Sequence, residues 1–397
     1  MLNQDLLFSA STVHLEHITT ALNCLIPFGI KEDVLIIIDK DGLSFARANN
    51  RVISIQLFLS KELFIAYNYN GPSGDPDSHT KVCVKINHIL DSISVANRDK
   101  DDVVECTLSY NGEGSPLILI FEDSMISERV EYSTYLLKDL EMADLEPDRD
   151  RLMFECIIRG DVLYNALQDL KEIGCKECYI YAITKTDGRN IFALISKSQL
   201  GLSKVVLPGE RTILEKLEVY SGEASIKVDN CPVIGYFDFS TFDKMRMSAK
   251  IASKILLRKD IHGLLNVNIL SQTDNVILVD SKITSKMQNT SDIRNAQLPK
   301  DYPGIVIDIS ILEKVHLEEF DVQEINLLME SPEEAQTKAI YQPSRPNDDG
   351  KVSTKDLDGN YDNNFLGLTK KRRIEDVEHE SDDENYQPVT KDMPLFF

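Results

Sequence analysis

The chain has 397 residues, of which 42% are hydrophobic, and a formal net charge of -22 at pH 7. That length suffices for about two domains with sizeable cores, whereas the acidic balance argues against a broadly basic, non-specific nucleic-acid coat. No apolar run approaches the roughly 20 residues that span a bilayer, and the N-terminus lacks the layout of a signal peptide. We therefore expect a cytosolic or nuclear protein with no membrane association.

Apolar residues at helical spacing predict a first helix near residues 12–26, with Leu15, Ile18, Leu22 and Leu25 on one face. A shorter helix is predicted near residues 87–96. The strands predicted from alternating polarity in this half lie at 33–39, 51–59, 81–86, 103–110, 116–123 and 129–137.

An acidic stretch with one proline and no strand pattern follows, and we interpret residues 138–152 as a connector between domains. The pattern then begins again with a helix near residues 161–173, which Gly174 ends. The strands predicted in this half lie at 177–183, 190–196, 200–208, 233–239, 263–271 and 275–281, with a further apolar segment at 302–315. The repeated order predicts a duplicated domain, occupying residues 1–137 and 153–320.

The last part of the chain changes in composition. We assign residues 321–397 to a mostly disordered tail, because the polar sequence from Ser331 onward has too few apolar residues for a core. Two short patterns in it suggest function. Lys370, Lys371, Arg372 and Arg373 fit a nuclear-import signal. Met393, Phe396 and Phe397 have the spacing of a docking peptide of the pattern Q-x-x-h-x-x-a-a, although Thr390 stands in place of the glutamine, and the alternative is an accidental terminal pattern.

One predicted helix is basic in this acidic chain. Residues 240–260 hold six Lys or Arg against two Asp, and Ser240 with Asp243 resembles a capping box. Arg246, Lys250 and Lys254 form a stripe at i, i+4 and i+8, about 120° round from the apolar face. This stripe would meet the phosphates of a polyanion, and the alternative is an ordinary solvated helix face.

Catalytic motifs are absent from the sequence, which has no phosphate-binding loop, dinucleotide fingerprint or H-E-x-x-H. Asp39 and Asp41 end an apolar strand, where a metal-dependent nuclease places acidic ligands, but they also fit a hairpin turn before Gly42. Cys175 and Cys178 form a single pair without a second pair at zinc spacing, which favours core packing. We expect no metal and no cofactor.

The chain resembles the DNA sliding clamps of the PCNA type, and more closely the fungal form of the Rad1 family of checkpoint clamp subunits. The resemblance covers residues 8–315 and is carried by segments such as "FSASTVHLEHITTALNCLIPFG" (8–29), "VKINHILDSISVANR" (84–98), "FALISKSQLGLSKVVLP" (192–208) and "LPKDYPGIVI" (298–307). It implies an α+β DNA clamp fold, with two similar domains that each pack two helices on antiparallel sheet.

The resemblance also implies a role. Such a subunit joins two other clamp-like subunits in a heterotrimeric ring, and an alternative clamp loader places the ring on double-stranded DNA at damage sites or primer-template junctions in the nucleus. There the ring promotes checkpoint kinase signalling, DNA repair and cell-cycle control, including the meiotic checkpoint. The four helices would line the hole. Carried onto this sequence, the DNA-facing residues would be Lys244, Arg246, Lys250, Lys254, Arg159, Lys171, Lys85 and Arg98.

A clamp needs no catalytic residue, because a ring that encircles DNA can rely on topology and weak, sequence-independent contacts. The alternative within the same family is a 3′–5′ exodeoxyribonuclease that would use Asp39 and Asp41. A third interpretation is an α+β scaffold that never touches DNA.

Overall fold

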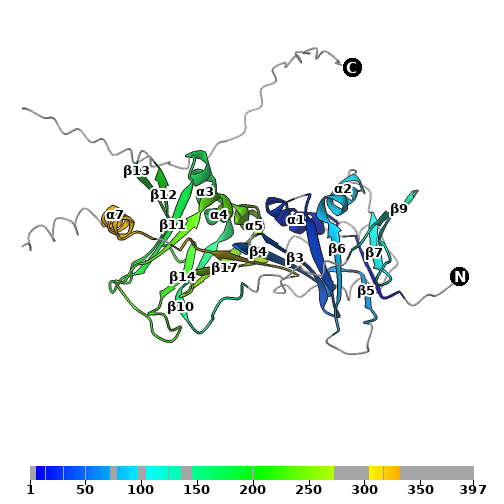
Figure 1. The fold of residues 1–397 in the computed structure, drawn as a ribbon, viewed down its shortest axis with the longest axis horizontal. Coiled ribbons are helices and arrows are strands. Elements are labelled where there is room, and N and C mark those ends of the chain that lie inside the picture. Colours follow the sequence, from blue (N-terminus) through cyan, green and yellow to red (C-terminus); the bar gives the residue numbers. More distant parts are fainter. Residues whose placement is uncertain are drawn as a thin grey trace, which may run out of the picture. The chain divides into compact units, whose positions relative to one another are not determined.

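The computed structural model describes residues 6–13, 15–29, 31–49, 51–71, 78–96, 104–123, 125–135, 145–198, 201–271, 304–315 and 317–330. Residues 1–335 form one unit and residues 336–397 another, and every described residue belongs to the first (Figure 1). Among the described residues, no helix is long and apolar enough to cross a membrane.

The first half contains the helices α1 and α2 and the short 3-10 helices η1 and η2. Its elements in chain order are β1 (Phe8–Thr12), α1 (Leu15–Leu22), η1 (Asn23–Phe28), β2 (Asp33–Ile38), β3 (Gly42–Asn49), β4 (Ile53–Ser60), η2 (Lys61–Leu63), β5 (Ala66–Tyr69), β6 (Thr80–Lys85), α2 (Ile86–Ala96), β7 (Glu105–Tyr110), β8 (Leu117–Glu122) and β9 (Ser127–Tyr132).

The second half follows the same order of strands and helices. Its elements are β10 (Leu152–Arg159), α3 (Gly160–Glu172), β11 (Glu177–Thr184), β12 (Asn190–Ser198), β13 (Gly201–Val206), β14 (Leu214–Val219), β15 (Val233–Asp238), α4 (Phe239–Phe242), η3 (Asp243–Met245), α5 (Arg246–Ile251), β16 (Lys254–Asp260), β17 (Leu264–Ser271) and β18 (Ile305–Leu312), with a further helix, α7 (Glu319–Met329). In each half a helix follows the first strand and helical turns follow the sixth.

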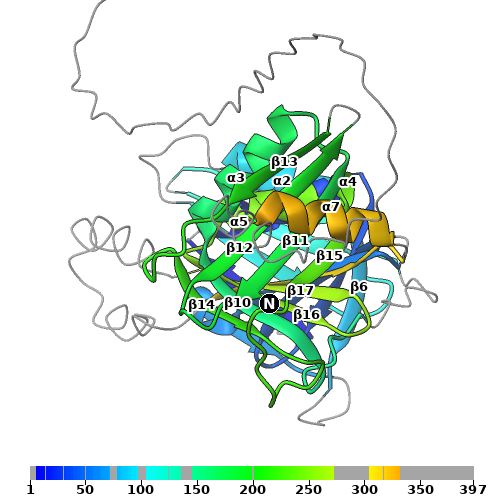
Figure 2. The same cartoon turned by 90° about the vertical axis from the view of Figure 1, so that its left-hand side faces the viewer.

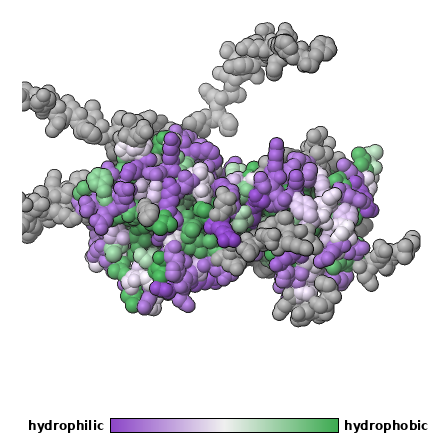
Figure 3. Space-filling view, in the orientation of Figure 1, coloured by the Kyte–Doolittle hydropathy of each residue, from purple (hydrophilic) through white to green (hydrophobic). Residues whose placement is uncertain are grey.

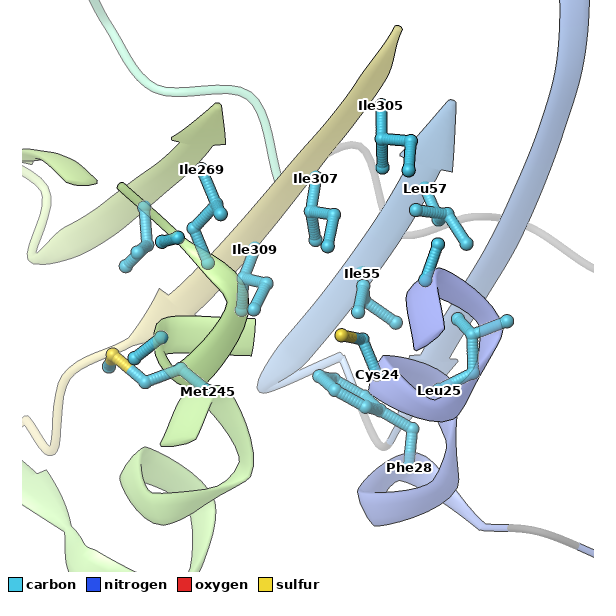
Figure 4. Close-up of a cluster of buried hydrophobic side chains, with 14 of the residues drawn as sticks. Cys24, Leu25, Phe28, Ile55, Leu57, Met245, Ile269, Ile305, Ile307 and Ile309 are labelled. Carbon is cyan, nitrogen blue, oxygen red and sulfur yellow. The ribbon is translucent and has the colours of Figure 1, made fainter. Parts of the chain in front are cut away.

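The strands pair antiparallel in three sheets, ordered β5-β1-β7-β8-β9, β14-β10-β16-β17-β18-β4-β3-β2-β6 and β13-β12-β11-β15. The nine-stranded sheet joins the two halves, because β18 of the second half pairs with β4 of the first. Alternate residues of this seam face the core. Ile305, Ile307, Ile309 and Ile311 of β18 lie opposite Leu59, Leu57, Ile55 and Ile53 of β4, and all are buried (Figure 4).

The helices of the two halves form one row on the core side of the sheets. Neighbours along the row contact each other in the order α2, α1, η1, α5 and α3, and in Figure 1 the row lies above the strands of the nine-stranded sheet. Buried residues of these helices and of all three sheets make one continuous apolar core. The α+β clamp arrangement expected from the sequence is therefore confirmed.

Helix α7 lies where the sequence was assigned to the tail. Residues 321–329 belong to this helix, which crosses the outer face of the β13-β12-β11-β15 sheet (Figure 2). Ile325 is fully buried against Tyr179 and Ile195. The tail assignment was wrong for this segment. The remaining residues of the assigned tail, from 331 onward, lie outside the described residues.

The predicted basic helix is shorter than its periodicity suggested. Helix α5 ends at Ile251, Ala252 is extended, and Lys254 begins strand β16. The stripe of Arg246, Lys250 and Lys254 was therefore wrong as a helical feature. Ile255 and Leu257 are buried at the two-residue period of a strand. This burial favours a strand here, although Ala252 and Leu256 are also at helical spacing.

Candidate nucleic-acid interface

The basic segment begins as three short helical pieces held by their apolar face. Phe242, Met245 and Ala249, which are at helical spacing, are buried. The N-cap is Asp238, whose carboxylate accepts a hydrogen bond from the amide of Thr241 at 3.0 Å. The predicted cap at Ser240 was therefore displaced by two residues.

Asp243 gathers two of the predicted cations. Its carboxylate lies 2.6 Å from Nε of Arg246 and 3.5 Å from Nζ of Lys171 on α3. Arg246 also donates to the side chain of Gln168 at 3.0 Å and lies over the ring of Tyr164. The hydrogen bond with Asp243 raises the pKa of Arg246. The Arg246 side chain is 15% exposed, so it joins α5 to α3 and has little surface to offer a ligand.

A second pair of cations meets where the two halves touch. Lys244 of η3 lies over the ring of Phe28, 5.7 Å from its centre. Burial and the neighbouring charge of Arg47 on β3 lower the pKa of Lys244. Arg47 donates to the backbone oxygen of Phe28 at 3.2 Å and lies 3.3 Å from the carboxylate of Glu32.

These residues adjoin a polar hollow lined by Pro27, Phe28, Gly29, Glu32, Arg47, Ala48 and Asn49. Sequence reasoning did not find Arg47. A lone arginine on a strand carries no pattern, and only the fold brings it near Lys244.

The other predicted DNA-facing residues are dispersed. Lys250, on α5, is exposed and makes no ion pair with any described residue. Arg159 pairs with Asp161, and Lys254 pairs with Glu215 at 2.7 Å. Lys85 is exposed at the end of β6.

The remaining predicted residues lie outside the described part of the chain. They are Arg98, Lys370, Lys371, Arg372, Arg373, Met393, Phe396 and Phe397.

The two candidate nuclease carboxylates serve a turn. Oδ1 of Asp39 accepts from the amides of Asp41 and Gly42 at 2.7 and 2.9 Å, and Asp41 lies 3.7 Å from Nζ of Lys61. Cys175 and Cys178 are both buried. Within the described ranges, no three or more His, Cys, Asp or Glu side chains converge as metal ligands.

Comparison with known proteins assigns the chain to a family. Residues 7–271 match the family described as repair protein Rad1/Rec1/Rad17. The chain belongs to this family. It is 56% identical over 402 residues to the DNA damage checkpoint control protein RAD17 of Saccharomyces cerevisiae, covering 98% of both chains. Schizosaccharomyces pombe rad1 is 24% identical over 281 residues, covering 66% of this chain and 81% of that one.

Solved structures agree with this assignment at the level of the fold. The proliferating cellular nuclear antigen of Entamoeba histolytica superposes with a TM-score of 0.55 at 11% identity, covering 78% of this chain and 99% of that one. A PCNA2–PCNA3 complex from Sulfolobus tokodaii gives a TM-score of 0.53 at 13% identity, covering 78% and 100%. This Rad1/Rec1/Rad17 member therefore has the PCNA-like clamp fold.

Proposed function

We propose that this chain is a non-enzymatic subunit of a heterotrimeric DNA damage checkpoint clamp. The observation that carries the proposal is one row of helices from both halves, backed by antiparallel sheet, in a member of the Rad1/Rec1/Rad17 family. The high identity to a checkpoint control protein supports the damage-response role.

The seam inside the chain supports assembly with other clamp-like subunits. Strand β18 is the last described strand of the second half, and it pairs with β4, the fourth strand of the first half. Among the described residues, the corresponding strands, β9 of the first half and β13 of the second, are edges with no partner strand on one side. A neighbouring subunit that repeats the β18–β4 pairing at these edges would extend the assembly head to tail, and such heterologous contacts form a ring when the rotation between subunits closes.

The DNA contact is proposed for the helix row. Lys250 and Lys244 would meet phosphates without reading sequence, and Lys85, Arg159, Lys171, Lys254, Arg246 and Arg98 would add to the positive potential at or near this surface. The contribution of Arg246 is mainly to hold α5 against α3. A clamp loader, checkpoint kinase signalling and a nuclear location complete the proposal, with residues 370–373 as the import signal and the C-terminal aromatic residues as a docking peptide.

The test is retention on circular DNA. The ring, assembled with its two partner subunits and its loader, is placed on nicked circular duplex DNA, which is then linearised. Encirclement predicts that the ring stays on circles at high salt and slides off linear DNA. A chain that leaves both forms equally fast would contradict the clamp role.

A matched pair of substitutions tests the DNA-facing surface. Lys250→Ala removes an exposed lysine of the helix row, whereas Lys227→Ala removes one that pairs with Glu218 away from that row. We expect Lys250→Ala to weaken the association of the assembled ring with DNA. The slope of log affinity against log salt should fall by about one. Equal salt slopes for the two variants would remove Lys250 from the interface.

The nuclease alternative is tested on the same preparation. Asp39→Asn keeps a side-chain acceptor for the β2–β3 turn but removes the carboxylate charge. Degradation of DNA by the wild-type chain that this variant abolishes would establish the exonuclease.

A further inference from the structure

The two halves can be matched residue by residue through their strand registers. In the first half Thr12 lies opposite Cys106, Cys106 opposite Phe121, and Phe121 opposite Glu128. In the second half Ile158 lies opposite Ile255, Ile255 opposite Ile269, and Ile269 opposite Ile307. Thr12 and Ile158 are each the last core-facing residue before the first helix of their half. Glu128 therefore occupies the place of Ile307.

A second path matches the fourth strands. From Val82, three residues before the end of β6, the register leads through Ile36 and Phe45 to Leu57. From Gly235, three residues before the end of β15, it leads through Ile180 and Leu194 to Val205. Val205 therefore occupies the place of Leu57.

These equivalences give the register of the proposed junction between β9 of one subunit and the strand equivalent to β13 in its neighbour. Inside the chain Ile307 lies opposite Leu57, so a neighbour that repeats this pairing brings its Val205 position opposite Glu128. Two residues away along each strand, the Leu207 position comes opposite Ile126, as Leu59 lies opposite Ile305 inside the chain.

The exposed Ile126 fits this register. It is 65% exposed, whereas Ile305 at the equivalent place is 6% exposed. It is held at the start of β9 by Asp123, whose Oδ1 accepts from the amide of Ile126 at 2.7 Å. Figure 3 shows hydrophobic side chains at the outer end of the half that carries β9. A neighbour with an apolar residue at the Leu207 position would cover them.

Glu128 does not fit a second copy of this chain. Its alternate neighbours Val130 and Tyr132 pack on the core, so it lies on the core-facing side of β9, where the inner seam has a fully buried isoleucine. Pairing with another copy would bury its carboxylate against Val205, which offers no hydrogen-bond donor. An unpaired buried carboxylate is strongly unfavourable.

The outward side of the same pairing is also unfavourable. Arg129 would lie opposite Lys204, and like charges directly opposite across two strands are destabilising. Arg129 is bound to Glu131 at 2.6 Å on its own strand, and Lys204 donates to the backbone oxygen of Leu328 on α7 at 2.6 Å. Both cations are thus held at the edges where they would meet.

We propose that Glu128, supported by Arg129 and Lys204, prevents this chain from pairing with itself and selects a clamp-like subunit of different sequence. The selected edge strand carries a hydrogen-bond donor or cation opposite Glu128, an acidic residue opposite Arg129 and an apolar residue opposite Ile126. This inference rests on the proposed ring assembly.

Sedimentation equilibrium of the full-length chain alone tests the inference. Glu128→Ile gives β9 the residue of the inner seam, so we expect the chain to self-associate more than about tenfold more tightly than wild type. Glu105→Ile is the matched control, since it removes the same charge and adds the same side chain at an exposed position of β7, an interior strand of the same sheet. Equal association of the two variants, or a wild type that associates as tightly as Glu128→Ile, would overturn the proposal.

A second variant keeps the test independent of any one substitution. Val205→Lys supplies a cation opposite Glu128, so it should also tighten self-association, whereas the double variant Glu128→Ile/Val205→Lys should return to within about threefold of wild type. No change in Val205→Lys, in a variant with wild-type circular dichroism, would contradict the register. Rings that still retain circular DNA in that case would leave the clamp role intact and reject only the selection by Glu128.

Discussion

Asp243 lowers the net positive charge of the helix row, because its carboxylate pairs with two of the cations. The sequence placed this residue at a helix start, but its carboxylate binds Arg246 and Lys171 instead. Arg246 lies three residues after Asp243, so this pair could be anticipated from the sequence. The pairing with Lys171 depends on α3 lying beside α5 and carries no local signal. Charge counted along the sequence therefore overstated the cationic surface.

Gly160 marks the closest approach of the same two helices. A Cβ at this position would lie 2.1 Å from the backbone oxygen of Ala252 and 2.7 Å from that of Ala249. We expect Gly160→Ala to lower the free energy of unfolding by about 1–3 kcal/mol, because backbone atoms must move to admit the methyl group. Thermal unfolding measures the effect. Asn165→Ala, on the exposed side of α3, is the control, and an equal melting temperature in both variants would contradict the close contact.

At the scale of elements, alternating polarity predicted most strands, and its failures have physical reasons. Helix α7 was missed because Phe320 and Leu327, at i and i+7, share one side of it, whereas Ile325 lies on another side. Two of these side chains are exposed and only Ile325 is buried, so no single apolar stripe stands out. The end of α5 was missed because residues 249–257 carry apolar side chains at both the helical and the strand period.

Strands β14, β10 and β16 share a network of charged side chains on the face away from the helices. Lys216 of β14 and Arg258 of β16 both bind the carboxylate of Glu155 on β10, and Nε of Arg258 lies 2.7 Å from it. Lys216 also lies 3.0 Å from Glu218, which accepts a hydrogen bond from Tyr220 at 2.7 Å. Burial opposes ionisation of Glu218, but bonds from Lys227, Tyr220 and Lys216 outweigh it and lower its pKa to about 2.

This network predicts a pH-dependent stability. The folded pKa of Glu218 lies below its ordinary value of 4.5, so its contribution is present above about pH 4.5 and is lost as the pH falls towards 2. We expect Glu218→Gln to cost about 1 kcal/mol at pH 7 and progressively less below pH 4.5. Urea unfolding across this range measures it, with exposed Glu210→Gln as the control. A deficit independent of pH would exclude ionisation as its cause.

At the scale of the whole chain, the order of elements and the family resemblance predicted a clamp, and the fold and the family membership are confirmed. The pairing of β18 with β4 was not predicted. Both strands are apolar on alternate residues, and that pattern is compatible with many partners and registers. Only the three-dimensional arrangement selects the seam that joins the first half to the second, and in the proposed assembly the same seam would be the template for the edges β9 and β13.

Because the nine-stranded sheet is continuous, the two halves should lose structure together. Ile307 is fully buried in the seam beside Leu57 and Ile269 (Figure 4). We expect Ile307→Ala to cost about 2–5 kcal/mol and to raise amide hydrogen exchange in strands of both halves. Ile195→Ala removes an equally buried side chain beneath α7, away from the seam, and should raise exchange mainly in the second half. If Ile307→Ala loosened only one half, the seam would not couple them, and the head-to-tail extension of the same pairing between subunits would lose its structural precedent.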